Sequence, residues 1–196
     1  DVSAELVTVV VPAYNAARTL NETLLSVRRQ THTDIEVIVV DDGSQDETGA
    51  IVLAHAAVDP RVQYVRQANA GVAAARNTAI RRARGAFIAP IDADDLWSPT
   101  KLELQLAEMR RGGRGVALVY SWFAVINAND EVTTVAKPEL EGDIFADLCF
   151  ANILGNGSSA LMRAAAVAEV VRRVVDELQG RDLAPDPESA VGIDFP

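Results

Sequence analysis

The chain of 196 residues has only one cysteine, Cys149, which excludes an intrachain disulfide and a cysteine-based zinc site. We expect this residue to be a small core side chain in a reducing compartment. No apolar run approaches the roughly 18–20 residues of a membrane span, and no signal-peptide pattern is visible. We therefore expect a cytoplasmic protein without a transmembrane segment, either free or peripheral to the inner face of a membrane.

Basic residues are scarce as well, because 18 Lys and Arg stand against 28 Asp and Glu, for a net charge of −10. This balance argues against a nucleic-acid partner, which requires a basic face. It does not exclude a phosphate ligand, whose charge a bound metal ion can neutralise. Nothing in the sequence indicates the oligomeric state.

The composition is otherwise that of a globular protein, with 49% hydrophobic and 23% charged residues, and predicts one domain over 1–179. Continuous apolar runs predict buried strands at 6–11, 36–40, 62–65 and 86–90. Helices are expected between them, at 20–30, 44–58 and 72–84. Thr19 and Ser44 begin capping boxes, and Gly85 follows the third helix. This order predicts an α/β fold with a Rossmann-like, mostly parallel central sheet and helices on both faces.

The second half of the chain is predicted to be mixed. Ser98 and Pro99 are typical of a helix start, and the helix is expected to end near 112. The remaining expectations are a long strand at 116–126 with a hairpin partner at 132–135, a short helix at 143–150, a Gly/Asn/Ser loop at 153–159, a strand at 160–162, a helix at 164–178, and a tail or irregular segment at 180–196.

Three carboxylates follow the fourth predicted strand: Asp92, Asp94 and Asp95. In an open α/β sheet, ligands bind at the carboxyl ends of the strands. Three acidic side chains at such a point repel one another unless a cation joins them. A divalent ion suits this place, because Mg²⁺ is held by few protein carboxylates together with phosphate oxygens and water.

Other strand ends carry polar groups toward the same predicted edge. They are Pro12, Tyr14 and Asn15 after the first strand, Asp41 and Asp42 after the second, and Asn69, Gly71, Arg76 and Asn77 around the start of the third helix. Tyr14 can stack on a base, and Asp42 can accept from a base N–H. Arg76 can bind phosphate. Together these groups suit a nucleoside diphosphate, although each alone could be a surface turn, a packed ring or a solvated arginine.

Four segments carry a family resemblance: 9–15 (VVVPAYN), 39–44 (VVDDGS), 69–77 (NAGVAAARN) and 91–95 (IDADD), followed by Pro99. In order and spacing they resemble the inverting family 2 glycosyltransferases of the GT-A fold. The resemblance covers about 6–110 and continues more weakly through 156–159 and Met162. It implies a donor-binding half at 6–110 and an acceptor-side half at 111–179.

The resemblance further implies a hexosyltransferase-type enzyme that uses a nucleotide-sugar donor, often UDP-linked, and a glycan, lipid or small-molecule acceptor. By the same resemblance, Asp94 binds Mn²⁺ or Mg²⁺ with help from Asp92 and Asp95. The implied donor-contacting residues are Pro12, Tyr14, Asn15, Asp42, Asn69, Gly71, Arg76, Asp92 and Ala93.

One part of the family pattern is not matched. Members carry an acidic pair beyond the Gly/Ser loop, one of which acts as general base, whereas here only Asp182 is available. A non-catalytic nucleotide-sugar-binding relative is therefore an alternative. A second alternative is an aspartate-nucleophile phosphotransferase of the haloacid-dehalogenase type. That class has its Asp-x-Asp on the first strand, with Thr or Val where this chain has Leu96.

Overall fold

A computed structural model describes residues 5–142 and 156–180. The first half contains β1 (Val7–Ala13), α1 (Leu20–Arg28), β2 (Ile35–Asp41), α2 (Thr48–Val58), β3 (Val62–Arg66), α3 (Val72–Ile80) and β4 (Phe87–Pro90). The second half contains α4 (Lys101–Arg111), η1 (Gly113–Gly115), β5 (Leu118–Tyr120), β6 (Phe123–Ile126), β7 (Val132–Ala136), η2 (Gly157–Ser159), β8 (Ala160–Arg163) and α6 (Ala164–Gly180).

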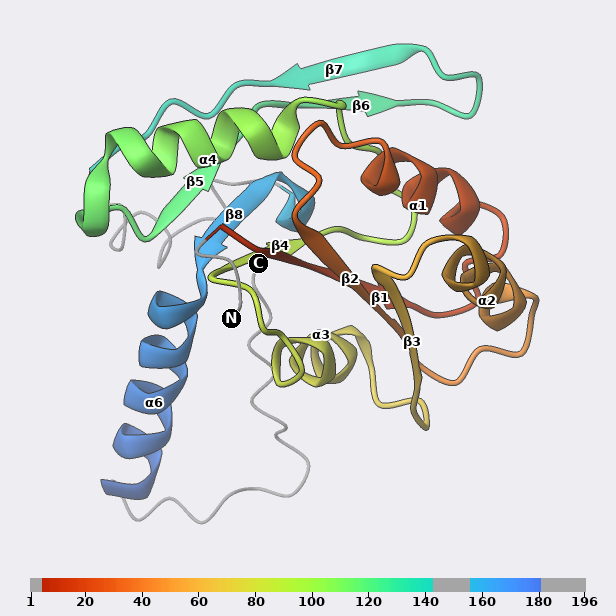
Figure 1. The fold of residues 1–196 in the computed structure, drawn as a ribbon, viewed down its shortest axis with the longest axis horizontal. Coiled ribbons are helices and arrows are strands. Elements are labelled where there is room, and N and C mark those ends of the chain that lie inside the picture. Colours follow the sequence, from red (N-terminus) through yellow and green to blue (C-terminus); the bar gives the residue numbers. More distant parts are fainter. Residues whose placement is uncertain (1–4, 143–155, 181–196) are drawn as a thin grey trace.

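The central sheet has the strand order β3-β2-β1-β4-β8-β5 (Figure 1). Strands β1 to β4 are parallel, with Val9 opposite Val37 on one side and Ala89 on the other. Strand β8 is antiparallel to both of its neighbours, β4 and β5. The predicted parallel first half and mixed second half are therefore confirmed. Because β1, β2, β4 and β5 point the same way, their carboxyl ends meet at one edge.

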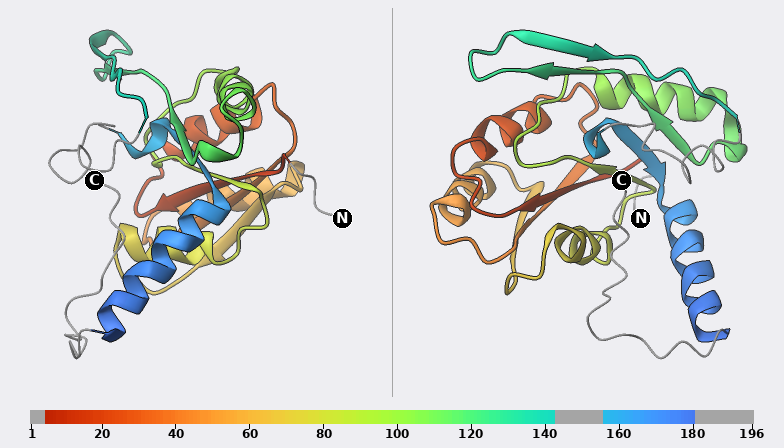
Figure 2. Two further views of the ribbon diagram at one scale, coloured as in Figure 1. Left: turned by 90° about the vertical axis from the view of Figure 1, so that its left-hand side faces the viewer. Right: turned by 180° about the vertical axis from the view of Figure 1, so that it is seen from behind.

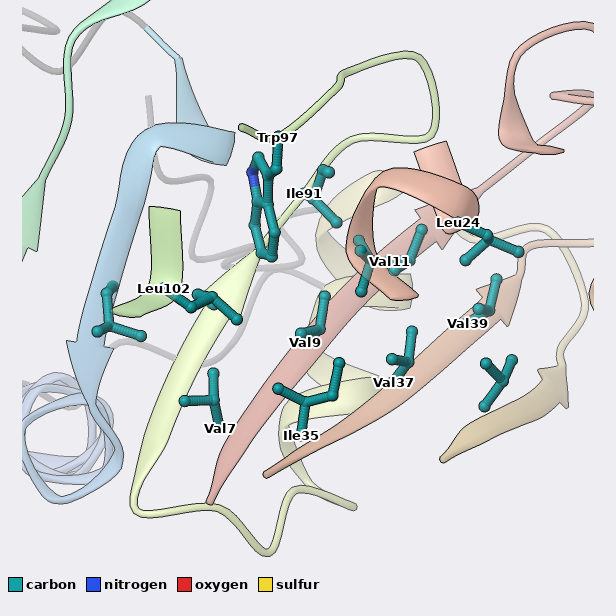
Figure 3. Packing of buried hydrophobic residues seen from close by; sticks show 14 of the residues in the cluster. Val7, Val9, Val11, Leu24, Ile35, Val37, Val39, Ile91, Trp97 and Leu102 are labelled. Atoms are coloured by element: carbon teal, nitrogen blue, oxygen red, sulfur yellow. The ribbon is translucent and has the colours of Figure 1, made fainter. Parts of the chain in front are cut away.

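Alternate residues of β1 pack against opposite layers of helices. Val7, Val9 and Val11 belong to a cluster with side chains of α1, α2 and α4 (Figure 3). Val10 instead packs with residues of α3 and α6, which lie below the sheet in Figure 1. All four valines are fully buried, and burial of each stabilises the fold by about 1.5–3 kcal/mol. Burial on both faces explains why this strand is an unbroken apolar run.

The helix starts differ from the sequence predictions. Thr19 precedes α1, but its side chain makes no capping hydrogen bond and donates to the carbonyl oxygen of Ala93 at 2.9 Å. Helix α2 begins at Thr48, because the Ser44 hydroxyl accepts from the backbone N–H of Asn15 at 3.0 Å. Helix α4 begins at Lys101 and not at Pro99. The hydroxyls of Thr19 and Ser44, which local spacing assigned to helix caps, form hydrogen bonds with distant segments instead.

Two further element boundaries were predicted wrongly. The long strand at 116–126 is split into β5 and β6, which belong to different sheets. Helix α3 ends at Ile80, so Gly85 is not its cap. A Cβ on Gly85 would lie 2.6 Å from the carbonyl oxygen of Leu6, so this position requires glycine for a close backbone approach. The predicted helix at 143–150 and the segment 181–196 lie outside the described residues.

Strands β6 and β7 form the predicted hairpin, which stands off from the central sheet (Figure 2). Several of its apolar side chains are exposed, among them Val125, Val132 and Val135. Within the described residues, no helix combines the length and the apolar character needed to cross a membrane.

Candidate functional site

The loops after β1 and β2 are joined at the carboxyl edge of the sheet. The N–H of Asn15 donates to Ser44 Oγ at 3.0 Å, and Asn15 Oδ1 accepts from the N–H of Gln45 at 2.9 Å. Asn15 has a φ of 48°, in the left-handed region that asparagine tolerates better than most residues. Pro12 is buried in β1, whereas Tyr14 is 53% exposed.

Asp42 is the centre of the second loop. This buried carboxylate accepts from Gln67 Nε2 at 2.7 Å, from the N–H of Ala70 at 3.0 Å and from the N–H of Gly71 at 2.8 Å. These hydrogen bonds bring the loop before α3 against the end of β2. Gly43 has a φ of +81°, and a Cβ on it would lie 3.0 Å from the backbone nitrogen of Asn69. The structure therefore places Asn69 and Gly71 beside Asp42.

The neighbouring Asp41 is a structural carboxylate. Burial raises its pKa, but hydrogen bonds from Ser44 and from the Tyr64 hydroxyl lower it by more, so the pKa lies below its usual value. The Tyr64 hydroxyl donates to Asp41 Oδ2 at 2.7 Å, and the N–H of Ser44 donates to Oδ1 at 2.8 Å. Asp41 thus remains charged while it closes the turn after β2.

Arg76 and Asp92 connect α3 to the loop after β4. Arg76 Nη2 lies 2.6 Å from Asp92 Oδ1, and the arginine side chain is 11% exposed against 36% for the aspartate. This ion pair holds the arginine side chain at the carboxyl edge of the sheet, beside the loop after β4. Gly157 is close by, because a Cβ on it would lie 3.8 Å from Arg76 Nη2.

Asp95 faces the turn that precedes β8. Its Oδ2 atom accepts from Ser158 Oγ at 2.6 Å and from Asn156 Nδ2 at 3.0 Å. The same Ser158 hydroxyl accepts from the N–H of Asp92 at 2.9 Å. On the other side of the loop, the carbonyl oxygen of Ala93 accepts from the hydroxyls of Thr19 and Thr23.

Asp94 differs from its acidic neighbours. It is exposed, and it makes no hydrogen bond or ion pair with any residue that the structure describes. Among the described residues, no group of three or more His, Cys, Asp or Glu side chains is arranged to hold a metal ion. A divalent ion that takes one carboxylate here and completes its shell with diphosphate oxygens and water fits this donor set.

A buried lysine, Lys101, begins helix α4 shortly after the loop that carries Asp92, Asp94 and Asp95. Lys101 Nζ donates to Gln105 Oε1 at 2.8 Å and lies 4.2 Å from the centroid of the Trp97 ring. Burial lowers the pKa of Lys101 to about 7. Gln105 Nε2 donates to the carbonyl oxygen of Ser159 at 2.7 Å, and Trp97 Nε1 donates to that of Ser158 at 2.8 Å. Helix α4 is therefore tied to the turn before β8.

The structure gathers most of the predicted site residues at one edge: Pro12, Tyr14, Asn15, Asp42, Asn69, Gly71, Arg76, Asp92, Ala93, Asp94 and Asp95. Asp182, the candidate base, lies outside the described residues. Sequence reasoning missed Gln67 and did not assign a role in the site to Asn156 or Ser158. The cluster of Asn, Gly and Ser at 156–159 was the available signal, because such residues often bond to backbone and side chains nearby.

Comparison with known proteins identifies the family of the chain. A family model described as glycosyl transferase family 2 matches residues 8–167. The chain is 37% identical over 135 residues to the Escherichia coli enzyme named UDP-Glc:alpha-D-GlcNAc-diphosphoundecaprenol beta-1,3-glucosyltransferase WfgD, covering 68% of this chain and 52% of that relative.

Two solved structures have a similar fold. One is S. aureus TarS 1–349 in complex with UDP-GlcNAc, with a TM-score of 0.66, 21% identity, and coverage of 85% of this chain and 47% of that one. The other is the mannosyltransferase PcManGT from Pyrobaculum calidifontis in complex with GDP-Man and Mn²⁺, with a TM-score of 0.59, 26% identity and coverage of 86% and 46%.

The likeness to these structures confirms the predicted GT-A fold. The chain spans about half the length of WfgD and of the two structures. The family model covers most of the chain and includes every site residue gathered at the edge of the sheet. The chain therefore belongs to glycosyl transferase family 2.

Proposed function

We propose that the protein is a metal-dependent glycosyltransferase that moves a sugar from a nucleotide-sugar donor, most simply a UDP-sugar, to an acceptor hydroxyl with inversion. The observation that carries the proposal is the convergence of Asp42, Arg76 and Asp94 at one edge of a parallel sheet. Support also comes from TarS and PcManGT, whose structures contain UDP-GlcNAc and GDP-Man with Mn²⁺. WfgD, about half of whose length is matched by this chain, is named as a UDP-Glc glucosyltransferase.

Each side chain has a role in this proposal. The exposed Tyr14 ring stacks on the base, Pro12 lines the same pocket, and the Asp42 carboxylate fixes the loop at 67–71 that borders the base. Arg76, turned toward Asp92, contacts the diphosphate. Asp94 holds Mn²⁺ or Mg²⁺, and Asp92 and Asp95 border that ion. Residues 6–110 then form the donor half and residues 111–179 the acceptor side.

The chemistry is a single displacement at the anomeric carbon. The bound divalent ion supplies charge that stabilises the leaving diphosphate. Arg76 adds fixed positive charge at the same group, with no reorganisation needed during the reaction. A general base removes the acceptor proton as the acceptor oxygen attacks from the face opposite the leaving group. Asp182 is the candidate for that base.

Thermal unfolding with UDP, GDP or ADP, each with Mn²⁺ or with EDTA, tests donor binding. A ligand at 100 times its Kd stabilises the folded state by about 2.7 kcal/mol, which corresponds to roughly 5–10 °C for a chain of this size. We expect this shift for UDP with Mn²⁺ and a smaller shift with EDTA. No shift with any nucleoside diphosphate would contradict the proposal.

Turnover separates the enzyme from a non-catalytic relative. We expect the protein to release UDP from at least one UDP-sugar in a panel, slowly with water and faster with its acceptor. Binding of UDP with no release from any donor, with or without acceptor mixtures, would instead identify a nucleotide-sugar-binding relative. Arg82, an exposed arginine just after the end of α3 that donates to the carbonyl oxygen of Thr78, offers a control, because Arg82→Ala should leave UDP release unchanged.

A further inference from the structure

The turn before β8 (156–159) contacts both ends of the acidic loop, which is the segment 92–95 after β4. Ser158 Oγ accepts from the N–H of Asp92 at 2.9 Å and donates to Asp95 Oδ2 at 2.6 Å. Within the loop, the N–H of Asp95 donates to the carbonyl oxygen of Asp92 at 3.1 Å. One hydroxyl therefore closes a short turn whose ends are Asp92 and Asp95, and Asp94 lies between them.

The Asp95 carboxylate is used in this contact. Oδ2 receives hydrogen bonds from both Ser158 Oγ and Asn156 Nδ2, and Asn156 Oδ1 accepts from the N–H of Ser158 at 2.6 Å. Hydrogen bonds to a charged acceptor are among the strong ones. Because Oδ2 already accepts two such donors, this oxygen is poorly placed to bind a metal ion as well, and it fixes the loop instead.

A second layer holds the turn itself in place. The carbonyl oxygen of Ser158 accepts from the indole N–H of Trp97, and that of Ser159 accepts from Gln105 Nε2. Trp97 and Ser158 are 6% and 5% exposed, so these contacts are shielded from water. Lys101 donates to Gln105 and covers the Trp97 ring. The turn therefore has little freedom to move relative to α4.

We propose that Ser158 and Asn156 are positioning residues, which hold Asp95 as an anchor so that the exposed Asp94 points at the place where the metal ion binds. The inference rests on the proposed metal-dependent donor binding. Its physical basis is preorganisation, because a ligand carboxylate fixed before binding loses less conformational entropy when the ion arrives. The acceptor-side half thereby controls the donor site of the other half.

Calorimetric titration with UDP in Mn²⁺ and in EDTA tests this role. Ser158→Ala should weaken UDP binding about tenfold in Mn²⁺, the typical effect of losing a hydrogen bond to a charged group, and less than about twofold in EDTA. Asn156→Ala should act in the same direction. Ser121→Ala is the matched control, because Ser121 Oγ donates to the carbonyl oxygen of Ser159 at 3.4 Å without reaching the acidic loop. It should bind UDP as the wild type does in both buffers.

Asp95→Asn tests the anchor without removing the hydroxyl, and urea unfolding verifies that each variant is folded. Asparagine keeps an acceptor oxygen for Ser158, so we expect UDP binding in Mn²⁺ to weaken less than about threefold. A loss as large as that of Asp94→Asn would make Asp95 a ligand and overturn the inference, as would wild-type affinity in Ser158→Ala. If the wild type itself binds no UDP in Mn²⁺, the proposed function fails and this inference fails with it.

Discussion

The loops after β2 and after β4 both carry carboxylates at the same edge of the sheet, but the hydrogen-bond partners of these carboxylates differ. Both follow a buried parallel strand, and both open with carboxylates at the same edge of the sheet. After β2, Asp41 and Asp42 each accept hydrogen bonds from groups of the protein itself. After β4, Asp92 meets an arginine, Asp95 meets a serine and an asparagine, and Asp94 has no partner among the described residues.

The contrast indicates how to recognise a ligand-binding carboxylate in such a site. A carboxylate that accepts several internal hydrogen bonds organises the chain around it, and its removal leaves buried N–H groups unsatisfied. A carboxylate that faces water without a protein partner costs nothing in stability to remove. Function should therefore depend most on Asp94 and stability most on Asp42, although both lie at the same edge.

Asp94→Asn should have the largest effect on activity and almost none on stability. If Asp94 holds the metal ion as proposed, loss of its carboxylate removes charge stabilisation worth several kcal/mol, so we expect sugar transfer to fall roughly 10³-fold. The free energy of unfolding should stay within about 0.5 kcal/mol of the wild type. Steady-state kinetics over a range of Mn²⁺ concentrations and urea unfolding measure the two quantities. Retained activity with unchanged Mn²⁺ dependence would remove the distinction between the two loops.

Asp42→Ala should instead lower stability substantially, and its effect on UDP binding should not depend on the metal ion. The buried N–H groups of Ala70 and Gly71 lose their acceptor, and we expect a loss of about 2–4 kcal/mol in the free energy of unfolding. UDP binding should weaken by the same factor in Mn²⁺ and in EDTA, because the change does not involve the ion. Urea unfolding and calorimetry test these expectations, and a variant as stable as the wild type would contradict the organising role of Asp42.

The loss of stability at acid pH should depend on Asp41, at the end of β2. Asp41 has a pKa below its usual value, so its charged form stabilises the fold above the unfolded value of about 3.9, and this stability is lost as the pH falls through the folded pKa. Tyr64→Phe removes one donor and should cost about 1 kcal/mol at neutral pH. The difference should shrink as Asp41 becomes protonated. Urea unfolding at several pH values would show this, with a pH-independent difference as the contrary result.

The smallest expected effect concerns Lys101, the first residue of α4. Its pKa of about 7 is below the unfolded value of about 10.4, so the unfolded chain binds more protons between these values and stability should rise with pH there. Lys101→Met should abolish that rise. At pH 6 we expect a gain of about 1 kcal/mol or less, because the Trp97 ring partly offsets the burial of the charge. Identical pH slopes in melting temperature would contradict the prediction.

The sheet and its acidic edge could be predicted from the sequence, because their signals are local. Strands buried on both faces, such as β1 and β2, are continuous apolar runs, and their alternation with helices fixes a parallel arrangement. Once the strands are parallel, Asp42 and Asp92 must lie at one edge. The order of β8 and β5 had no such signal, since antiparallel insertion depends on pairing between distant segments.

The partners of the site carboxylates could not be predicted for the same reason. Asp95 and Ser158 are 63 residues apart, and Thr19 and Ala93 are 74 apart. Local spacing assigned Thr19 to a capping box, yet its hydroxyl bonds to the loop after β4. A short polar side chain can satisfy either partner, and only the packed tertiary structure decides between them.

The place of β8 between β4 and β5 has a consequence for the order in which the protein is made. The first four strands leave the ribosome before α4, and they can pair as soon as they emerge. The hydrogen bond between Ser158 and Asp95 must wait for 63 further residues after Asp95. At about 5–20 residues per second this delay is roughly 3–13 s. A nascent chain can therefore assemble its parallel strands several seconds before Ser158 can fix the loop that carries Asp94.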